Sequence, residues 1–132
     1  VGIEQADGKI LSRPYSVVNS PNESFLEIIA VPVENGSLSP LLHELKEGDN
    51  LKVMSPATGF LIIDEVPPSE NLFMLATGTG VGPFLSIIQS KEVWEAHKKI
   101  VLVYAVRKIE GLVQTDKKLG QEIELLRRLV EE

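Results

Sequence analysis

The stretch from Leu72 to Phe84, LFMLATGTGVGPF, constrains the fold of this chain more than any other. Its five leading apolar residues fit a strand that is buried on both faces, as in a parallel sheet. Gly78, Gly80 and Gly82 follow at alternate positions, and glycine has no Cβ to hinder a tight turn or the approach of a bulky ligand. Pro83 suits the first turn of a helix. The stretch therefore predicts a strand, a tight loop and a helix in direct succession.

A second apolar run completes this unit. Residues 100–105, IVLVYA, are typical of another buried strand, and the helix between the two runs is predicted from Pro83 to about Trp94. A strand, a helix and a strand in this order form a βαβ unit. A last helix is predicted from about Asp116 to Glu132. Its apolar stripe consists of Leu119, Ile123, Leu126 and Val130.

The chain before the Pro67-Pro68 pair has a different pattern. Short strand-like segments lie at residues 25–31, 51–54 and 60–63, and turn signals such as Asn35-Gly36 separate them. Several short strands at this spacing suggest an antiparallel barrel or sandwich. The proline pair is the candidate linker between the two halves.

One short helix is predicted inside this first half, from Pro40 to Lys46. Ser39 is a suitable N-cap, Pro40 suits the first helical position, and Gly48 can close the C-terminal end. The helix would follow directly on the segment NGSLSPLL.

Composition excludes several classes of function. The 132 residues include 43% hydrophobic and 24% charged residues, as in globular domains, and no apolar run approaches the roughly 20 residues of a membrane span, so no membrane insertion is expected. The absence of cysteine is compatible with a cytoplasmic location, and two distant histidines predict no metal site. A net charge of −6 argues against nucleic-acid binding. Because the chain begins at Val1 rather than at Met, we expect it to be a fragment.

Three segments are candidates for binding a phosphorylated, flat ligand. The glycine loop precedes a helix whose free N–H groups favour an anion such as a pyrophosphate, but it reads G-x-G-x-G-P rather than G-x-G-x-x-G and lacks the Walker lysine. A tight turn without a ligand is the alternative. In NGSLSPLL, Ser37, Ser39 and the helix N-terminus can present hydroxyls and amides to a phosphate, or simply cap the helix.

The third segment is the quartet Arg13-Pro14-Tyr15-Ser16. Arg13 offers a bidentate cation for a phosphate, Tyr15 a flat face for a heteroaromatic ring, and Ser16 a hydroxyl for a ring nitrogen. A surface ion pair, a core tyrosine and a strand-end hydroxyl are the ordinary alternatives.

Taken in order, RPYSVVNSP, LEIIAVPVENGSLSPLL, ATGFLIIDEVP, LFMLATGTGVGPFLSIIQ and IVLVYAVR resemble the bacterial ferredoxin/flavodoxin–NADP⁺ reductases, over nearly all of the chain. R-x-Y-S alone would indicate only the wider flavin-reductase superfamily, whereas its combination with G-x-L-S and A-T-G-T-G-x-x-P-F-L-S is specific. The resemblance implies a partial antiparallel β-barrel that binds FAD, over residues 1–66, and a partial α/β parallel-sheet domain that binds NADP(H), over residues 67–132. It also implies a central fragment, without the first barrel strands and the C-terminal part.

The resemblance assigns three catalytic positions: Tyr15 would stack on the isoalloxazine ring, Ser16 would bond near flavin N5, and Thr79 would lie where flavin and nicotinamide meet. The implied FAD-binding residues are Arg13, Pro14, Tyr15, Ser16, Ile29, Ala30, Val31, Ser37, Leu38, Ser39 and Thr79. The implied NADP-binding residues are Thr77, Gly78, Gly80, Pro83, Val106 and Arg107, the last as a partner of the 2′-phosphate. The chain departs from the family at Gly82, where many members have Ala, and at Tyr104, where many have His.

The activity implied is that of an FAD-dependent oxidoreductase, which passes electrons between NADP(H) and ferredoxin or flavodoxin by hydride transfer at flavin N5. A monomer is favoured. Two alternatives stay open: a reductase module of an oxygenase or haem-protein system, and a non-catalytic FAD-binding subunit that bridges electron carriers. Docking of an acidic carrier would need a local basic patch. The candidates for this patch are Lys9, Arg13, Lys98, Lys99 and Lys108.

Overall fold

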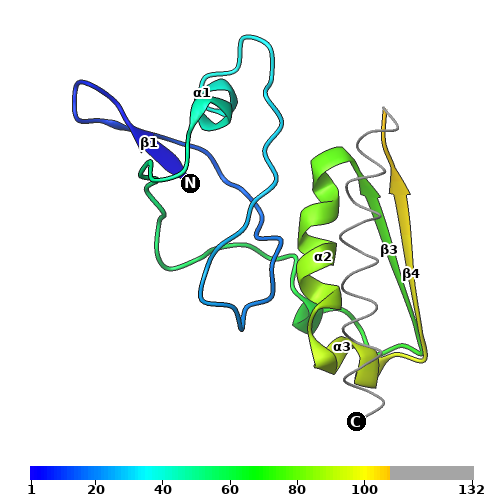
Figure 1. Cartoon of the computed structure of the whole chain (residues 1–132). Helices are drawn as coiled ribbons and strands as arrows, with labels where there is room; N and C mark the ends of the chain where they lie inside the picture. The colour runs from blue at the N-terminus through cyan, green and yellow to red at the C-terminus, as the bar shows by residue number, and fades with distance from the viewer. Residues whose placement is uncertain (108–132) are drawn as a thin grey trace.

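The computed structural model describes residues 1–107, and its second half contains the predicted βαβ unit. Strand β3 (Asn71–Thr77) pairs in parallel with β4 (Lys99–Ala105), in a register that runs from Asn71↔Lys99 to Thr77↔Ala105. The 3₁₀ helix η2 (Gly78–Val81) and the helices α2 (Gly82–Ile88) and α3 (Lys91–Ala96) connect the two strands. Figure 1 shows α2 and α3 on one side of this two-stranded sheet.

The single helix predicted from Pro83 to Trp94 is wrong in one respect, because two helices occupy this stretch. Ser90 has an extended backbone (φ −91°, ψ 135°), and its hydroxyl donates to the carbonyl of Ile87 (2.9 Å). The break turns the chain, so that α3 starts at Lys91 and leads to β4.

The core of this half lies between β3 and α2. Leu72, Met74 and Ala76 of β3 are buried, and they alternate with exposed residues. The expected burial of both sheet faces is therefore wrong for β3: Phe73 and Leu75 are 60% and 70% exposed. One crossover connection places α2 and α3 on a single face, which leaves these two side chains on the other. The buried cluster comprises Val18, Leu72, Met74, Ala76, Val81, Leu85, Ile88 and Val93.

The first half is less regular than predicted. Strands β1 (Gly2–Glu4) and β2 (Ile10–Ser12) form an antiparallel hairpin, followed by α1 (Ser39–Glu44) and the 3₁₀ helix η1 (Ile63–Glu65). The strands expected at 25–31, 51–54 and 60–63 are not formed. Only isolated antiparallel bridges remain there, Val17↔Ile28 and Gly2↔Lys52. Residues 1–66 therefore show antiparallel pairing but no closed barrel.

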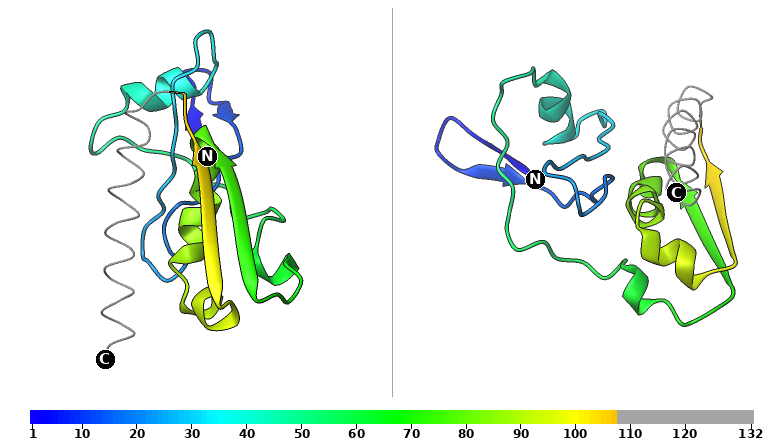
Figure 2. Two further views of the ribbon diagram at one scale, coloured as in Figure 1. Left: turned by 90° about the vertical axis from the view of Figure 1, so that its right-hand side faces the viewer. Right: turned by 60° about the horizontal axis from the view of Figure 1, so that its bottom comes forward.

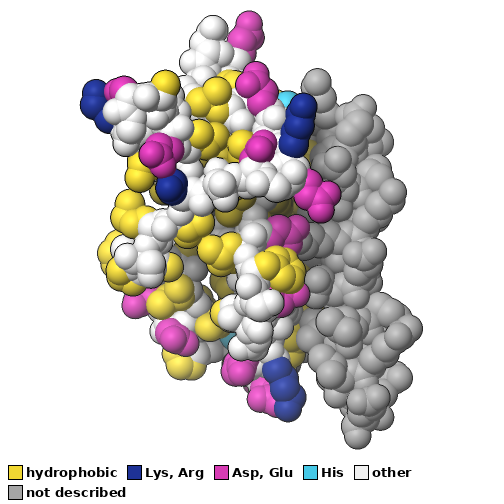
Figure 3. All heavy atoms as spheres, turned by 60° about the vertical axis from the view of Figure 1, so that its left-hand side comes forward, with side chains coloured by type: hydrophobic (Ala, Val, Ile, Leu, Met, Phe, Trp, Pro, Cys, Tyr) yellow, Lys and Arg dark blue, Asp and Glu magenta, His cyan; other side chains and the backbone are white. Residues whose placement is uncertain are grey.

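Within the described chain, the segments that form no strands lack neighbours against which their apolar side chains could pack. Apolar residues favour a strand when they pack against neighbours on a pleated surface, and here many of them face solvent. The exposed ones in these segments are Phe25, Leu26, Val31, Leu51, Val53, Met54, Phe60, Leu61 and Ile62. Figure 3 shows hydrophobic side chains gathered on the side of the molecule that lies at the left in Figure 1, where the first half of the chain is.

Helix α1 forms close to its predicted place but ends at Glu44, two residues before the predicted Lys46. Ser39 is the first helical residue rather than the N-cap, and its hydroxyl accepts the N–H of Val33 (3.1 Å). Gly48 has a φ of +96° and belongs to the next turn, where the N–H of Asp49 donates to Lys46 (3.0 Å).

Figures 1 and 2 show α2 between the first half of the chain and the β3–β4 sheet. Val18 of the first half is fully buried in the core cluster of the second, and Ile29 packs against it. Of the helices in residues 1–107, none is long and apolar enough to cross a membrane. The helix predicted from Asp116 to Glu132 and the candidate docking residue Lys108 lie outside the described residues.

Candidate functional site

The structure brings Arg13 and Ser37 together, although 24 residues separate them. Arg13 follows β2 directly; its Nη1 donates to the carbonyl of Ser12 (2.7 Å) and its Nη2 to the hydroxyl of Ser37 (3.2 Å). Within residues 1–107, no ion pair joins the exposed Arg13 to a carboxylate. A cation and a hydroxyl thus lie side by side at the surface, which is a suitable donor set for a phosphate.

The loop that presents Ser37 is tightly closed. The N–H of Gly36 donates to the carbonyl of Val33 (2.8 Å), and the hydroxyl of Ser39 accepts the N–H of Val33. The side chain of Leu38 is 2% exposed and anchors the loop, whereas the neighbouring Ser37 is exposed to solvent. The loop that carries Ser37 is therefore fixed by the bond within it and by its attachment to the start of α1.

Tyr15 and Ser16 lead from Arg13 into the core. Tyr15 is half-buried and Ser16 exposed, and Val17 then forms its bridge with Ile28. The N–H of Val18 donates to the carbonyl of Glu27 (2.9 Å). Because the bridge is antiparallel, the residues that precede Val17 and those that follow Ile28 leave it in the same direction. The segment Ile29-Ala30-Val31 is thus a neighbour of the quartet at this bridge.

The glycine loop is open on one side and packed on the other. Gly78 has a left-handed backbone (φ +51°), and a Cβ added at Gly78 or Gly80 would meet no atom within 4 Å. A Cβ at the buried Gly82 would lie 3.3 Å from Cγ2 of Val18. Thr77 and Thr79 are exposed, and Pro83 stands in the first turn of α2 as predicted. The open side leaves room for a ligand against the backbone.

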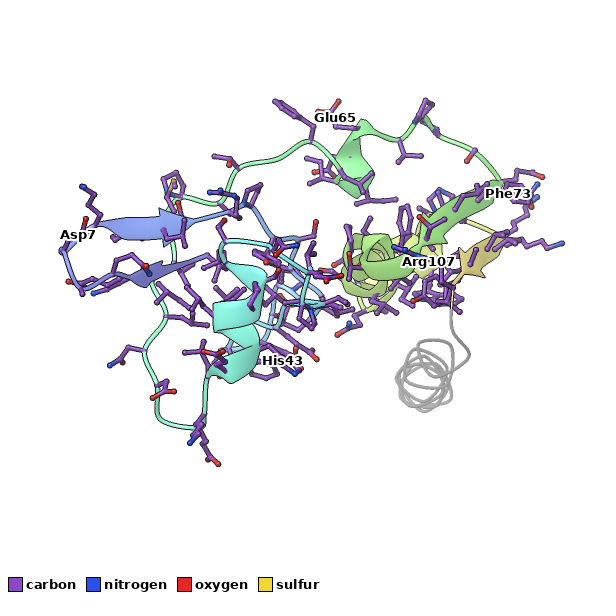
Figure 4. The ribbon with its side chains drawn as sticks, turned by 90° about the horizontal axis from the view of Figure 1, so that it is seen from above. Asp7, His43, Glu65, Phe73 and Arg107 are labelled. Atoms are coloured by element: carbon purple, nitrogen blue, oxygen red, sulfur yellow. The ribbon has the colours of Figure 1, made fainter. Side chains whose placement is uncertain are left out.

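Val106 and Arg107 follow β4 as Gly78 follows β3. Since Thr77 and Ala105 are partners in the parallel register, the residues after both strands lie at one edge of the sheet. Arg107 is exposed and has no ion pair among residues 1–107. Figure 4 shows Arg107 beside the βαβ unit, whereas Asp7 and His43 lie on the first half of the chain.

The predicted residues therefore form two sets: Arg13 with Ser37, and the glycine loop with Arg107. In the described part of the chain, no hydrogen bond joins the two sets directly. The segment between them is fixed instead by Asn19, Ser86 and Gln89, which the sequence analysis missed. Their only signal was that the motif segments VVNSP and LSIIQ contain polar residues beside apolar ones, and polar side chains of this kind are usually exposed.

The shifted pKa values belong to surface pairs away from both sets. The ammonium of Lys9 lowers the pKa of the Asp7 carboxyl, and the carboxylate of Glu95 raises the pKa of Lys91. In the same region as Asp7, a surface hollow lies over the turn from Gln5 to Leu11, and no predicted site residue lines it. Among residues 1–107, no three acidic or histidine side chains are placed to hold a metal ion.

Comparisons with known proteins identify the family. The model of the oxidoreductase NAD-binding domain matches residues 74–123. The flavodoxin/ferredoxin–NADP reductase of Escherichia coli (strain K12) is 50% identical over 107 residues, 81% of this chain and 43% of that protein. The ferredoxin–NADP reductase of Azotobacter vinelandii is 43% identical over 112 residues, 85% of this chain and 43% of that protein.

A solved structure agrees with these relatives. The crystal structure of a ferredoxin NADP⁺ reductase from Neisseria gonorrhoeae with bound FAD and NADP matches with a TM-score of 0.77 and 33% identity, over 88% of this chain and 47% of that one. The chain thus spans less than half of the length of the relatives it matches. By sequence and by fold, the chain is a member of the ferredoxin/flavodoxin–NADP reductase family over the residues that it shares with these proteins.

Proposed function

We propose that this chain supplies FAD- and NADP(H)-binding residues to a flavoprotein that passes electrons between NADP(H) and ferredoxin or flavodoxin. The observation that carries the proposal is the contact between Arg13 and Ser37, which joins two segments that the family resemblance had assigned to one cofactor. The relatives' names, and the FAD and NADP in the neighbouring structure, support the same assignment.

The first half would hold FAD. The guanidinium of Arg13, which forms no ion pair among residues 1–107, and the hydroxyl of Ser37 suit a pyrophosphate, since charge-assisted hydrogen bonds to phosphate oxygens are strong. Tyr15 would offer its ring face and Ser16 its exposed hydroxyl to the isoalloxazine. The remaining contacts would come from Pro14, Ile29, Ala30, Val31, Leu38 and Ser39, with Thr79 from the second half.

The second half would hold NADP(H) at the carboxyl edge of β3 and β4, where α/β sheets generally bind their ligands. The open sides of Gly78 and Gly80 would let a dinucleotide approach the backbone. Arg107, exposed and without an ion pair in the described chain, would meet the 2′-phosphate. Thr77, Pro83 and Val106 would complete this site.

We accordingly assign residues 1–66 to the FAD-binding part and 67–132 to the NADP(H)-binding part. Bound FAD would supply the redox chemistry, a two-electron exchange with NADP(H) and single-electron exchange with the carrier. The chain itself would bind and orient: Tyr15, Ser16 and Thr79 would position the reacting groups without acting as strong acids or bases.

Charge pairing narrows the candidates for carrier docking. Lys9 pairs with Asp7 (3.0 Å) and Lys98 with Glu70 (2.6 Å), so their charges are compensated. Lys99 is exposed and forms no ion pair within the described chain. Lys99 is therefore the better candidate for contact with an acidic carrier, because the charge of Arg13 would be compensated by the FAD pyrophosphate.

Two arginine substitutions in the intact protein test the proposal and control for each other. Arg13→Ala should weaken FAD retention roughly tenfold to hundredfold, because a hydrogen-bonded charge contributes about 1.5–3 kcal/mol. Arg107→Ala should leave flavin content unchanged, and it should lower the affinity for NADPH much more than the affinity for NADH. For each variant, flavin absorbance after dialysis measures FAD retention, and titration with NADPH and with NADH measures nucleotide affinity.

Flavin content that is unchanged in Arg13→Ala would refute the assignment of the quartet. Equal losses of NADPH and NADH affinity in Arg107→Ala would refute the 2′-phosphate contact. A wild-type protein that retains flavin but is not reduced by NADPH would favour a bridging subunit over a reductase.

A further inference from the structure

Residues Val18, Asn19 and Ser20 are tied to helix α2 by three hydrogen bonds. The amide of Gln89 donates to the carbonyl of Val18 (2.9 Å), and its Oε1 accepts the N–H of Ser20 (3.0 Å). The hydroxyl of Ser86 donates to the carbonyl of Asn19 (2.8 Å). Ser86 of α2 and its C-cap Gln89 are three positions apart, so they lie on one side of the helix, the side that bonds to residues 18–20.

Asn19 shapes the segment that these bonds hold. Its side chain is almost fully buried, at 2% exposed, and it bonds within its own loop rather than to α2. Its Nδ2 donates to the carbonyl of Phe25 (2.7 Å), and its Oδ1 accepts the N–H of Glu27 (2.7 Å). A buried amide with satisfied hydrogen bonds fixes a backbone firmly, because loss of any partner leaves a costly unpaired group.

Apolar packing reinforces the contact. The side chain of Val18 is fully buried in the core cluster together with Leu85 of α2. Gly82 at the start of α2 lies so near that an added Cβ would be 3.3 Å from Cγ2 of Val18. The helix and the segment therefore meet both through side chains and through close backbone approach.

We infer that Asn19, Ser86 and Gln89 are positioning residues, which form a polar clamp between the two cofactor-binding parts of the protein. The clamped segment, Val18 to Ser20, begins two residues after Ser16 of the quartet, and α2 begins directly after Val81. The clamp would thus set the distance between the Arg13–Ser16 segment and Thr79. This inference rests on the proposed function.

Reaction rate is sensitive to such a distance. Reacting atoms must be held about 3–3.5 Å apart, and a displacement of about 1 Å can slow a reaction roughly hundredfold. A loosened clamp should therefore lower the rate of flavin reduction more than it lowers the affinity for either cofactor, because each cofactor's own contacts lie elsewhere.

Three variants of the intact protein test the clamp. Gln89→Met removes two of the three bonds, and Ser86→Ala removes the third. Ser90→Ala is the matched control, since the Ser90 hydroxyl donates to the carbonyl of Ile87 at the end of α2 and not to residues 18–20. We expect Gln89→Met to slow flavin reduction at saturating NADPH at least tenfold, and Ser86→Ala about threefold to tenfold. Flavin content and NADPH affinity should stay within about twofold of wild type.

Amide hydrogen exchange gives a readout that needs no activity. In the cofactor-free protein, the N–H of Ser20 should exchange at least tenfold faster in Gln89→Met than in wild type, and at the wild-type rate in Ser90→Ala. If Gln89→Met fails to fold, Ser86→Ala alone decides, because it removes a single hydrogen bond.

The outcomes distinguish the positioning role of the clamp from the proposed function. If NADPH reduces wild type normally and the clamp variants react like Ser90→Ala, the positioning role is overturned and the proposed function stands. If wild type retains no flavin or is not reduced by NADPH, the proposed function fails, and the positioning role fails with it.

Discussion

Gly36 is the single residue on which the position of Ser37 depends most directly. A Cβ added there would lie 2.9 Å from the carbonyl oxygen of Val33 and 3.0 Å from the hydroxyl of Ser39. The first of these atoms belongs to the backbone and cannot rotate away. The loop that presents Ser37 to Arg13 therefore needs glycine at this position.

We expect Gly36→Ala to lower the free energy of unfolding by about 1–3 kcal/mol, the usual cost of overpacking. It should also weaken FAD retention, because the loop must shift Ser37. Gly80→Ala is the control for stability, since its Cβ would meet no atom within 4 Å. Urea denaturation of both variants measures the difference, and equal stability of the two would contradict the loop geometry.

Single residues also show what could be predicted from the sequence and what could not. Pro83 was placed correctly in the first turn of α2, because a proline's preference is local. Ser39 was predicted to be an N-cap, but its hydroxyl accepts the N–H of Val33 instead. Asn19 and Gln89 gave no functional signal, because their partners are fixed only by the packing of distant segments.

Among the elements, β3 and β4 were predictable and the strands of the first half were not. Each run is apolar over at least five residues, and the parallel pairing follows from the helices between them. Residues 25–31 are apolar at every position except Glu27 but form only one bridge, because pairing depends on neighbouring strands that no local pattern encodes. The break between α2 and α3 was missed because apolar periodicity continues across it.

Helix α2 and the inner face of β3 form the most sensitive contact between elements. Leu85 is 1% exposed, so Leu85→Ala should cost about 2–5 kcal/mol of unfolding free energy. Leu75→Ala makes the same chemical change on the outer face, where Leu75 is 70% exposed, and should cost less than about 1 kcal/mol. Chemical denaturation of the intact protein compares them. Equal losses would mean that the outer face of β3 is also covered there.

At the scale of the whole molecule, the boundary at Pro67-Pro68 separates two patterns of sequence but not two independent cores. Val18 and Ile29 come from the first half and pack into the cluster built on β3 and α2. The sequence pattern could not reveal this, since Val18 lies in a segment with only an isolated bridge. The two halves should therefore unfold together rather than one after the other.

Val18→Ala tests this coupling. The valine is fully buried, so its truncation should cost about 2–3 kcal/mol from lost burial and the remaining cavity. The single tryptophan, Trp94, lies in α3, and its indole N–H donates to the carbonyl of Ile88 (2.7 Å). Its fluorescence thus reports the second half, although the substitution is in the first. Trp94 fluorescence and hydrogen exchange of residues 1–31 should give the same loss of stability. If the first half loosens while the Trp94 transition keeps its wild-type midpoint, the two halves are independent, and residues 17–20 cannot hold the cofactor-binding parts in register.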